Sequence, residues 1–411
     1  MYDIITFKSD KLTIETNGER NKSFKINSVT KKGARLFKDK KVFSGSFVGD
    51  ITDRELLKQT EENSKVGLDC SFEQADASTF DYVQEGFDTF DPMSLKDDVK
   101  KTQELISDYH KDYLFNGTFT VTKNHETLVS GNGINHSVKK YNYDCYYIFK
   151  EKGSPNLMDG YFGSSGTKFE METAFKSFRP YLDKFKNKIE LPDGEYPIVI
   201  ADDDSSWYYK LLESFYADKY YEGSALYSGK LGKKLFSDKL SLYDERYNPE
   251  YGMTAKYDDE GTQTEWDLFP LIEKGVMKNV IADKRLAHKY KIKSTGNGLR
   301  GYATAPSTSF HKVVFGKGNR TFNQILSGME KCLVVFMAHG GDFTDKGEFS
   351  TPIHLGYLVE KGNIIGRLPQ LTLITTLDKM FGENLIEFSS DNFWGPSSQV
   401  NLFHKVKIIN N

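Results

Sequence analysis

The chain has 411 residues, of which 38% are hydrophobic and 27% are charged, and its formal net charge is −3. A chain of this length forms about two domains, each with a sizeable core, and the composition is that of an ordinary soluble protein. No basic stripe interleaved with aromatic residues stands out, so we expect no nucleic-acid partner. No segment approaches the ~20 apolar residues of a membrane span, so we expect no membrane association.

The N-terminus and the cysteines indicate a cytoplasmic protein. Residues 1–8 mix charge with a short apolar run, so we expect no signal peptide. Cys70, Cys145 and Cys332 are odd in number and lack C-x-x-C spacing. Buried thiols in a reducing cytoplasm are the simplest account of them.

The first half of the chain predicts a mixed α and β domain. Alternating apolar and polar residues predict strands over 3–8, 11–16, 23–30, 35–37, 41–48, 115–122 and 140–149. On the last of these, one face carries Tyr141, Tyr143, Cys145, Tyr147 and Phe149.

Three helices are predicted among these strands. Thr52 to Glu55 has the form of a capping box, and the helix it begins runs to about Asn63. Ser94 is the expected N-cap of the second helix, whose apolar stripe consists of Leu95, Val99, Thr102, Ile106 and Tyr109. The third helix is expected over 170–189, with a kink or break at Pro180.

A domain boundary is predicted at 191–195, which gives an N-terminal α+β domain over 1–192 and a C-terminal β-rich domain over 193–411. A short strand over 196–200 leads into Asp202-Asp203-Asp204. This run either ligates Mg²⁺ or is a solvated cluster at a helix start, where the helix dipole favours negative charge. Ser205 or Ser206 then begins a helix through about Tyr220.

Three glycine-anchored points divide the stretch from Gly252 to Arg300. They are Asp258-Asp259-Glu260-Gly261, Glu273-Lys274-Gly275 and Ser294-Thr295-Gly296-Asn297-Gly298. The middle point, between Leu271-Ile272 and the run 276–281, predicts a β-hairpin with φ > 0 at Gly275. The outer two place carboxylates and backbone N–H groups on loops, where functional sites are frequent. Each point taken alone is also consistent with an ordinary turn.

Together, in this order and spacing, the three points resemble the TldD/PmbA family, also called the modulator-of-DNA-gyrase family. Its members carry a D-D-E-G segment, a hairpin with leucine-isoleucine before its glycine, and an S/T-G-N-x-x-R segment. Gly33-Ala34-Arg35 stands where the family has a G-x-R element, and 196–200 matches its G-x-Y-P-V-V strand. The resemblance is weak before residue 190 and good from 190 to about 375. It implies an α+β N-terminal domain and a C-terminal domain built on a curved, antiparallel, barrel-like sheet.

The zinc site of the TldD branch has no counterpart in this sequence. That branch carries H-E-x-x-x-H on the helix after the boundary and a cysteine near the C-terminus. The best alignment sets Glu213, Ser214 and Asp218 at the positions of the first ligand, the catalytic Glu and the second ligand, and 389–396 contains no cysteine. The chain therefore resembles the PmbA branch, also called TldE, which lacks the zinc motif. We expect no metal on this chain and zinc on a TldD-type partner.

A carboxylate site formed by Glu213 and Asp218 is the alternative on this helix. The two residues are i,i+5 apart, which places them roughly 140° apart around a continuous helix, a poor pair for one ion. A solvated or partner-facing role for both residues is the other interpretation.

Other chemistries find less support in the sequence. The histidines lack short ligand spacing; they are His110, His125, His136, His288, His311, His339, His354 and His404. His339 precedes Gly340-Gly341, and it is interpreted either as a catalytic group or as part of a plain turn. No G-x-S-x-G segment is present, and Gly296-x-Gly298 lacks the third glycine of a dinucleotide loop.

The resemblance implies a subunit of a cytoplasmic peptidase assembly that degrades unfolded peptides or trims modified-peptide precursors, with this chain shaping the cavity. The partner is then a TldD-type zinc subunit or a second copy of this chain. The alternative is a non-catalytic binding or regulatory protein of the gyrase-modulator type, acting alone or as a homodimer. An adjacent reading frame with H-E-x-x-x-H would distinguish the two.

In the peptidase assembly, we expect the following residues to contact the substrate or the partner. They are Asp258, Asp259, Glu260, Gly261, Asn297, Arg300, Glu213 and Asp218. We expect no catalytic residue on this chain. The hairpin edges at 271–281 and 357–368 would bind an extended peptide by β-addition. Bracing of their own loops is the alternative role for each of these residues.

Overall fold

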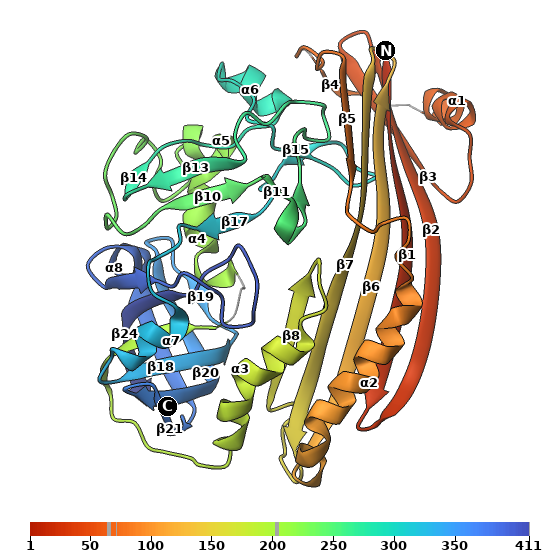
Figure 1. The fold of residues 1–411 in the computed structure, drawn as a ribbon. Helices are drawn as coiled ribbons and strands as arrows, with labels where there is room; N and C mark the ends of the chain where they lie inside the picture. Colours follow the sequence, from red (N-terminus) through yellow and green to blue (C-terminus); the bar gives the residue numbers. More distant parts are fainter. Residues whose placement is uncertain (64–66, 71, 202–204, 411) are drawn as a thin grey trace.

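The computed structural model describes residues 1–63, 67–70, 72–201 and 205–410 (Figure 1). The Asp202-Asp203-Asp204 run considered above for Mg²⁺ lies outside the described residues. The chain is mixed α and β, as predicted.

A long twisted sheet forms the N-terminal part and follows the order β4-β3-β2-β1-β6-β7-β5, with β8 on β7. Its strands are β1 (Tyr2–Asn17), β2 (Arg20–Lys38), β3 (Lys41–Val48), β4 (Leu68–Asp69), β5 (Ser78–Val83), β6 (Tyr113–Ser130), β7 (Ile134–Glu151) and β8 (Gly160–Gly166). Neighbours are antiparallel except β5 and β7, which are parallel. Predicted strands 3–8 and 11–16 merge into one strand, as do 23–30 and 35–37, because the β1–β2 pairing continues through the residues between them.

The three predicted N-terminal helices are present as α1 (Asp53–Asn63), α2 (Leu95–Ile106) and α3 (Met171–Asp183). The capping box is confirmed, since the Thr52 N–H donates to Glu55 and the Glu55 N–H donates to Thr52 Oγ1. Ser94 makes no side-chain cap; Asp91 instead caps a 3₁₀ turn, Pro92–Ser94, that precedes α2. The third helix continues through Pro180 but ends at Asp183, short of the predicted 189.

The C-terminal part contains a closed barrel of β18 (Cys332–Ala338), β9 (Gly194–Ile200), β24 (Leu402–Asn410), β22 (Leu371–Thr376) and β20 (Glu348–Glu360), with β20 pairing back to β18. The expectation of a purely antiparallel barrel is wrong, because β9 and β18 are parallel. Three short strands extend it: β19 (Asp342–Phe343), β21 (Asn363–Arg367) and β23 (Leu385–Phe388).

A second C-terminal sheet follows the order β14 (Val276–Met277), β13 (Leu268–Glu273), β10 (Leu242–Glu245) and β17 (Val313–Phe315). The hairpin turn at Gly275 is confirmed: Lys274 and Gly275 have φ of 45° and 77°, and Lys361 and Gly362 of the β20–β21 hairpin have 51° and 80°. Positive φ at both turn residues suits the right-handed twist of a tight hairpin. The two hairpins belong to different sheets.

The remaining elements are short. The remaining helices are α4 (Tyr209–Leu212), α5 (Ala217–Tyr221), α6 (Lys284–Tyr290), α7 (Phe322–Ser327) and α8 (Leu377–Phe381). The remaining 3₁₀ turns are Ser107–Lys111, Ser205–Trp207, Glu213–Phe215 and Pro249–Tyr251. The remaining strands are β11 (Tyr247–Asn248), β12 (Met253–Thr254), β15 (Gly298–Leu299) and β16 (Ser307–Thr308).

The single helix predicted from Ser205 to Tyr220 is wrong. The chain is extended at Tyr216, with ψ of 124°, because its neighbours bond to a distant segment. Ile281 N–H donates to Phe215 O at 2.7 Å, and Ala217 N–H donates to Ile281 O at 3.1 Å. These tertiary bonds replace the helical bonds and divide the segment into pieces.

One hydrophobic core is shared by the two halves of the chain. It contains Phe119 and Tyr147 from the long sheet, Phe178 from α3 and Phe336 from the barrel. The rings of Phe178 and Phe336 meet edge to face with centroids 5.1 Å apart. This packing fixes the barrel against the sheet, while the division into domains at 192 stays a prediction.

Candidate functional site

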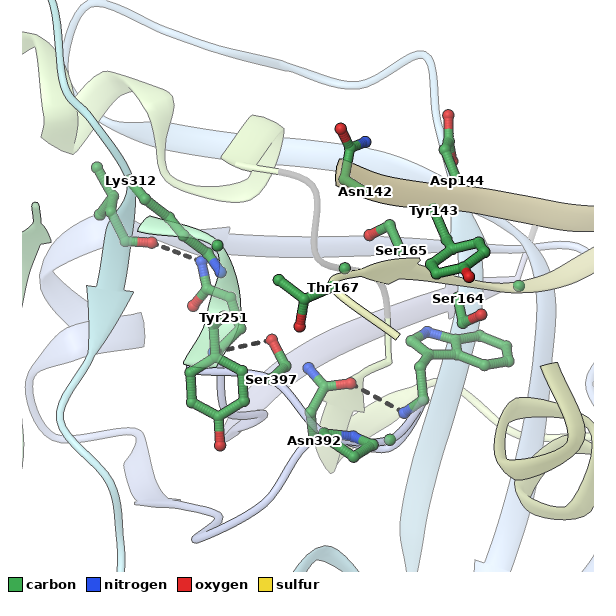
Figure 2. Close-up of a pocket in the computed structure, with 18 of the residues that line it drawn as sticks. Asn142, Tyr143, Asp144, Ser164, Ser165, Thr167, Tyr251, Lys312, Asn392 and Ser397 are labelled. Atoms are coloured by element: carbon green, nitrogen blue, oxygen red, sulfur yellow. Dashed lines mark hydrogen bonds between the residues drawn. The ribbon is translucent and has the colours of Figure 1, made fainter. Parts of the chain in front are cut away.

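A cleft with a volume of about 1500 Å³ lies between the long sheet and the C-terminal part. One wall is formed by β7 and β8, and the other by the α4–α5 segment, the 249–251 turn and the loops 310–313 and 392–399. Figure 2 shows both walls, with Asn142 and Ser165 on the first and Tyr251 and Lys312 on the second. The cleft is rich in aromatic side chains, which include Tyr146, Tyr161, Tyr208, Tyr209, Tyr216, Phe310 and Trp394.

The edge of strand β8 that faces away from β7 lies at this cleft. The strand pairs with β7 through one edge, and among the described residues no strand pairs with the other. A Cβ added to Gly166 would meet no atom within 4 Å, so the space beside this residue is open. An edge with open backbone groups can pair with an extended peptide.

Glu213 and Asp218 both line the cleft, as the alignment with the TldD-type ligands implies. Lys219 donates to Glu213 Oε1, and Lys210 Nζ lies 3.1 Å from Glu213 Oε2. Burial opposes ionisation of Glu213, but the two ammonium groups outweigh it and lower its pKa. Asp218 accepts from the Lys219 N–H at 2.8 Å.

These residues do not fit zinc. Both oxygens of Glu213 already face ammonium groups, and no group of three His, Cys, Asp or Glu side chains in the described residues is arranged to hold a metal. The histidine that lines the cleft, His311, lies with its Nε2 2.8 Å from Gly296 O. The angle of about 140° expected between Glu213 and Asp218 assumed a continuous helix, so that estimate no longer applies.

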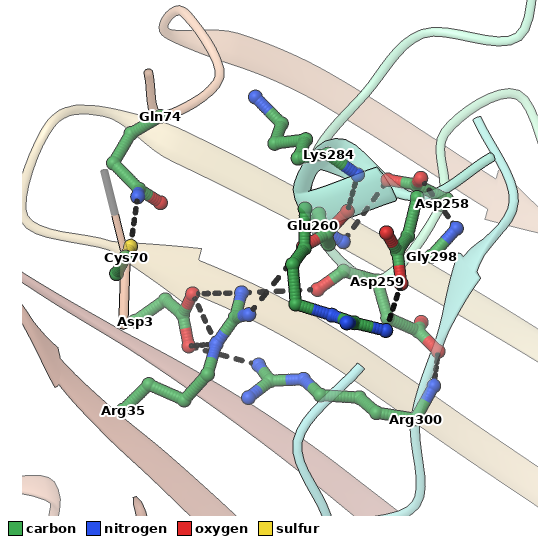
Figure 3. A network of polar contacts seen from close by, with 12 residues as sticks. Asp3, Arg35, Cys70, Gln74, Asp258, Asp259, Glu260, Lys284, Gly298 and Arg300 are labelled. Atoms are coloured by element: carbon green, nitrogen blue, oxygen red, sulfur yellow. Dashed lines mark hydrogen bonds and ion pairs between the residues drawn. The ribbon is translucent and has the colours of Figure 1, made fainter. Parts of the chain in front are cut away.

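The predicted residues at 258–261 and Arg300 come together away from the cleft lining, in a buried group that joins the two halves of the chain (Figure 3). Arg300 Nη2 donates to Asp3 Oδ1 at 2.9 Å, and Arg35 Nε donates to the same carboxylate at 3.0 Å. We call this group the interface cluster; its members are Asp3, Arg35, Asp258, Asp259, Glu260, Asp283, Lys284 and Arg300.

Backbone N–H groups hold the carboxylates of the interface cluster. Asp258 accepts from Glu260 and Thr262 through Oδ1 and from Gly298 through Oδ2, at 2.8–3.0 Å. Asp259 Oδ2 accepts from the Arg300 N–H at 2.8 Å. Glu260 Oε2 accepts from the Lys284 N–H at 2.9 Å and also lies against Gly298, where a Cβ would come within 2.4 Å. Glycine at 298 therefore lets two carboxylates approach one backbone site.

Burial dominates the electrostatics of this cluster. It raises the pKa of Asp258 to about 7, helped by the charge of Glu260, and the pKa of Asp259 to about 6. Burial, followed by the repulsion of Arg35, lowers the pKa of Arg300 to about 10. The cluster thus contains carboxyl groups that titrate near neutral pH.

Asn297 belongs to a neighbouring buried network. Its Oδ1 accepts from Arg246 at 2.6 Å, and its Nδ2 donates to Asp244 at 2.8 Å and to Ser309 O. The side chain is fully buried and braces the loops of the second sheet.

Gly33 and Gly261 fit the two halves of the chain together. A Cβ on Gly33 would lie 1.8 Å from the carbonyl oxygen of Tyr302, and one on Gly261 would lie 2.4 Å from Ile134 Cδ1. The G-x-R element therefore supplies a glycine for close approach and an arginine, Arg35, for the interface cluster. Sequence reasoning placed this element but missed Asp3, which carries no local signal.

The hairpin edges predicted for β-addition are occupied over part of their length. Met277 N–H donates to Lys233 O, and Leu235 N–H donates to Gly275 O, so the segment 232–236 lies on the first edge. Residues 187–189 lie on the second, where Arg367 N–H donates to Asn187 O at 2.7 Å. At these positions a peptide would have to displace the protein's own chain.

Of the remaining predictions, His339 is exposed and its carbonyl oxygen lies 3.1 Å from His354 Nε2. The three cysteines are free and buried. Within the described ranges, every helix is too short or too polar to cross a bilayer.

Comparison with known proteins identifies the family. Residues 193–405 match the PmbA/TldA metallopeptidase C-terminal domain. A TldD homologue described as a metalloprotease, from Buchnera aphidicola, is 27% identical over 193 residues, which span 45% of this chain but only 39% of that protein. A metalloprotease of Archaeoglobus fulgidus is 22% identical over 391 residues, covering 90% of this chain and 88% of that protein.

The fold is similar to that of a solved structure across the whole chain. The crystal structure of TldE from Thermococcus kodakarensis superposes with a TM-score of 0.85 at 18% identity, covering 100% of this chain and 96% of that chain. With a family model matching more than half of its length and the fold matching throughout, the chain belongs to the PmbA/TldD metallopeptidase family.

Proposed function

We propose that the chain is a PmbA/TldE-like subunit of a two-chain cytoplasmic peptidase, in which a TldD-type partner holds the zinc. The observation that carries the proposal is Glu213, which takes the place of the first zinc ligand in the alignment and is neutralised by Lys210 and Lys219. A carboxylate held by two ammonium groups is a poor metal ligand and a poor general base.

The substrate in this proposal is an extended, unfolded peptide or a modified-peptide precursor. The cleft is large enough for a segment of peptide, and the open edge of β8 supplies backbone groups that recognise a main chain without regard to sequence. Aromatic side chains along the opposite wall, such as Tyr209 and Phe310, supply apolar contact. This chain would thus shape the cavity while the partner cleaves.

The buried residues at 258–261, with Asn297 and Arg300, support this cavity indirectly. Their polar groups bind one another and the N-terminal sheet, so they fix the position of the cleft walls. Glu213 and Asp218 line the cleft, so in this proposal they are the members of the predicted set that contact substrate or partner directly.

The test combines the purified chain with an H-E-x-x-x-H protein from the same genome and an unstructured peptide. We expect no cleavage by this chain alone, and chelator-sensitive cleavage when both are present. Cleavage by this chain alone would contradict the division of labour, and so would a partner whose activity does not change when this chain is added.

A non-catalytic binding protein, acting alone or as a homodimer, is the second candidate. It is favoured by the presence of the whole cleft within one chain, since ligand binding then requires no partner. The same mixing experiment separates the two, because a stand-alone binder takes up peptide without raising the activity of any zinc subunit.

A further inference from the structure

The two walls of the cleft touch each other at one end of β8. Thr167, the residue after β8, donates through Oγ1 to Glu250 O at 2.9 Å, and Lys140 of β7 donates through Nζ to Gly252 O at 3.5 Å. Both acceptors belong to the turn 249–252 between β11 and β12. A Cβ on Gly252 would lie 3.3 Å from Thr167 Cγ2, which leaves no room for another chain between them. We call these contacts the bridge.

Past the bridge, the two walls stay packed together. On β7, the lining of the cleft begins at Lys140. Earlier on the same strand, the ring of His136 lies against that of Tyr257, with centroids 4.1 Å apart. Further on, Ile134 Cδ1 would lie 2.4 Å from a Cβ on Gly261. The cleft is therefore closed at the bridge.

The open edge of β8 leads toward this closed end. The strand runs from Gly160 to Gly166, and the next residue, Thr167, forms the bridge. A peptide paired along the open edge therefore points one of its ends at the turn 249–252. The 7 residues of β8 pair with a segment about 23 Å long, at about 3.3 Å per residue.

Lysine side chains surround the closed end. Lys140 and Lys168 line the cleft there, and among the described residues neither ammonium group forms an ion pair. Lys317 lies over the ring of Tyr251 in the turn, 5.8 Å from its centroid. The carboxylate of the same turn belongs to Glu250, which is exposed. These ammonium groups favour a terminal carboxylate and repel a terminal amine.

We propose that the cleft binds the C-terminal end of an extended peptide. The peptide main chain lies along the open edge of β8, and its terminal carboxylate lies beside Lys140 and Lys168. The bridge then acts as a stop, so an internal segment of a longer chain does not fit. The inference rests on the proposed function for the class of substrate and adds which part of the substrate the cleft holds.

The test compares forms of one unstructured peptide of about ten residues, with a dye on an internal side chain, by fluorescence anisotropy on the full chain. The forms are the free acid, the C-terminal amide, a fusion to a folded domain at the C-terminus and the same fusion at the N-terminus. We expect the amide to bind about threefold or more weaker than the acid and the C-terminal fusion about tenfold or more weaker. The N-terminal fusion should bind within about twofold of the acid.

Equal affinities for all forms would overturn this inference and leave peptide binding intact. So would a loss of affinity confined to the N-terminal fusion. Binding of none of the forms would contradict the proposed function itself, and the inference with it.

Variants test the role of the lysines. With Lys140→Met and Lys168→Met together, the acid should bind no better than the amide. Lys152→Met, an exposed change outside the cleft lining, should keep the full difference. A preference for the acid that survives the paired change would show that these ammonium groups do not hold the carboxylate.

A disulfide tests whether the bridge stays closed while peptide binds. The close approach of Gly252 to Thr167 suits a disulfide in the variant Thr167→Cys with Gly252→Cys, and the three native cysteines are buried. Oxidised and reduced samples of this one variant share any strain at the positive φ of residue 252. We expect the free acid to bind both samples within about twofold. A loss of binding on oxidation, restored by reductant, would show that the walls part here and would overturn the stop.

Discussion

The Arg300 guanidinium bonds to the carboxylate of Asp3 at 2.9 Å, although the two residues lie 297 positions apart in the chain. Both side chains are almost completely buried. The same carboxylate accepts from Arg35, so one acid from the first strand pairs with two arginines at the junction of the two halves. This arrangement makes Arg300 a residue of the interface, and its own loop is held through its backbone N–H.

Replacing Arg300 by lysine should therefore lower stability. Lysine keeps the charge but lacks the planar guanidinium, and we expect Arg300→Lys to lower the free energy of unfolding by about 1–3 kcal/mol. Urea titration measures this change. Arg320→Lys is the matched control, since Arg320 pairs with Glu387 at a half-exposed site and should change stability by no more than about 0.5 kcal/mol. Normal stability with lost activity of the assembled enzyme would instead assign Arg300 a direct role.

Stability should fall as the pH rises from acid values to neutrality. Burial raises the pKa of Asp258 from 3.8 to about 7 and that of Asp259 from 3.8 to about 6. The folded state thus binds more protons than the unfolded state between these values, so the stabilisation is complete below the unfolded pKa of 3.8, falls as the pH rises above it, and is gone once the pH has passed through 6 to 7. Unfolding titrations across this range should show the decline. Asp259→Asn should flatten it, and a rise in stability over the same range would contradict the assignment.

Gly33→Ala should lower the stability of the protein more than Gly301→Ala does in the neighbouring loop. The added methyl would lie 1.8 Å from the Tyr302 carbonyl, so the loop must shift, and we expect a loss of about 1–3 kcal/mol. Gly301→Ala is the control, because its methyl would meet only Thr304 at 3.5 Å. Thermal unfolding of the two variants tests this, and equal melting temperatures would show that the loop is not held at Gly33.

Filling the cleft should weaken peptide binding without affecting the fold. Ser165 lines the cleft on β8, and a tryptophan there would obstruct the open strand edge, so we expect affinity for an extended peptide to fall about tenfold or more in Ser165→Trp. Ser28→Trp, on the exposed part of β2, provides the same change away from the cleft. Fluorescence anisotropy of a labelled peptide gives the affinities. Equal binding by both variants would place the peptide elsewhere.

The purified chain should carry no stoichiometric zinc. The carboxylate of Glu213 is held by Lys210 and Lys219, and the aligned positions supply neither histidine nor cysteine. Elemental analysis after dialysis measures the metal content. About one zinc per chain would refute this expectation and restore the carboxylate site as a candidate.

Local signals in the sequence were sufficient for many elements. The capping box at Thr52, the strand 41–48 and the glycine turn at Gly275 were predicted correctly, because each depends on residues close together in the chain. The family was also evident from the three glycine-anchored segments and the missing zinc motif, since these are ordered patterns of residue types.

Tertiary structure decided the rest. The helix expected from Ser205 to Tyr220 is broken because residues 215 and 217 bond to Ile281, and no pattern within the segment reports a partner so far away. The parallel pairing of β9 with β18 likewise joins strands more than a hundred residues apart. The predicted site separated into a cleft that holds Glu213 and Asp218 and a buried cluster that holds Asp258 and Arg300, because only folding brought Asp3 beneath the 258–300 loops. A sequence shows which side chains can ionise, whereas burial and the distance between charges, which set their pKa values and their roles, depend on the folded chain.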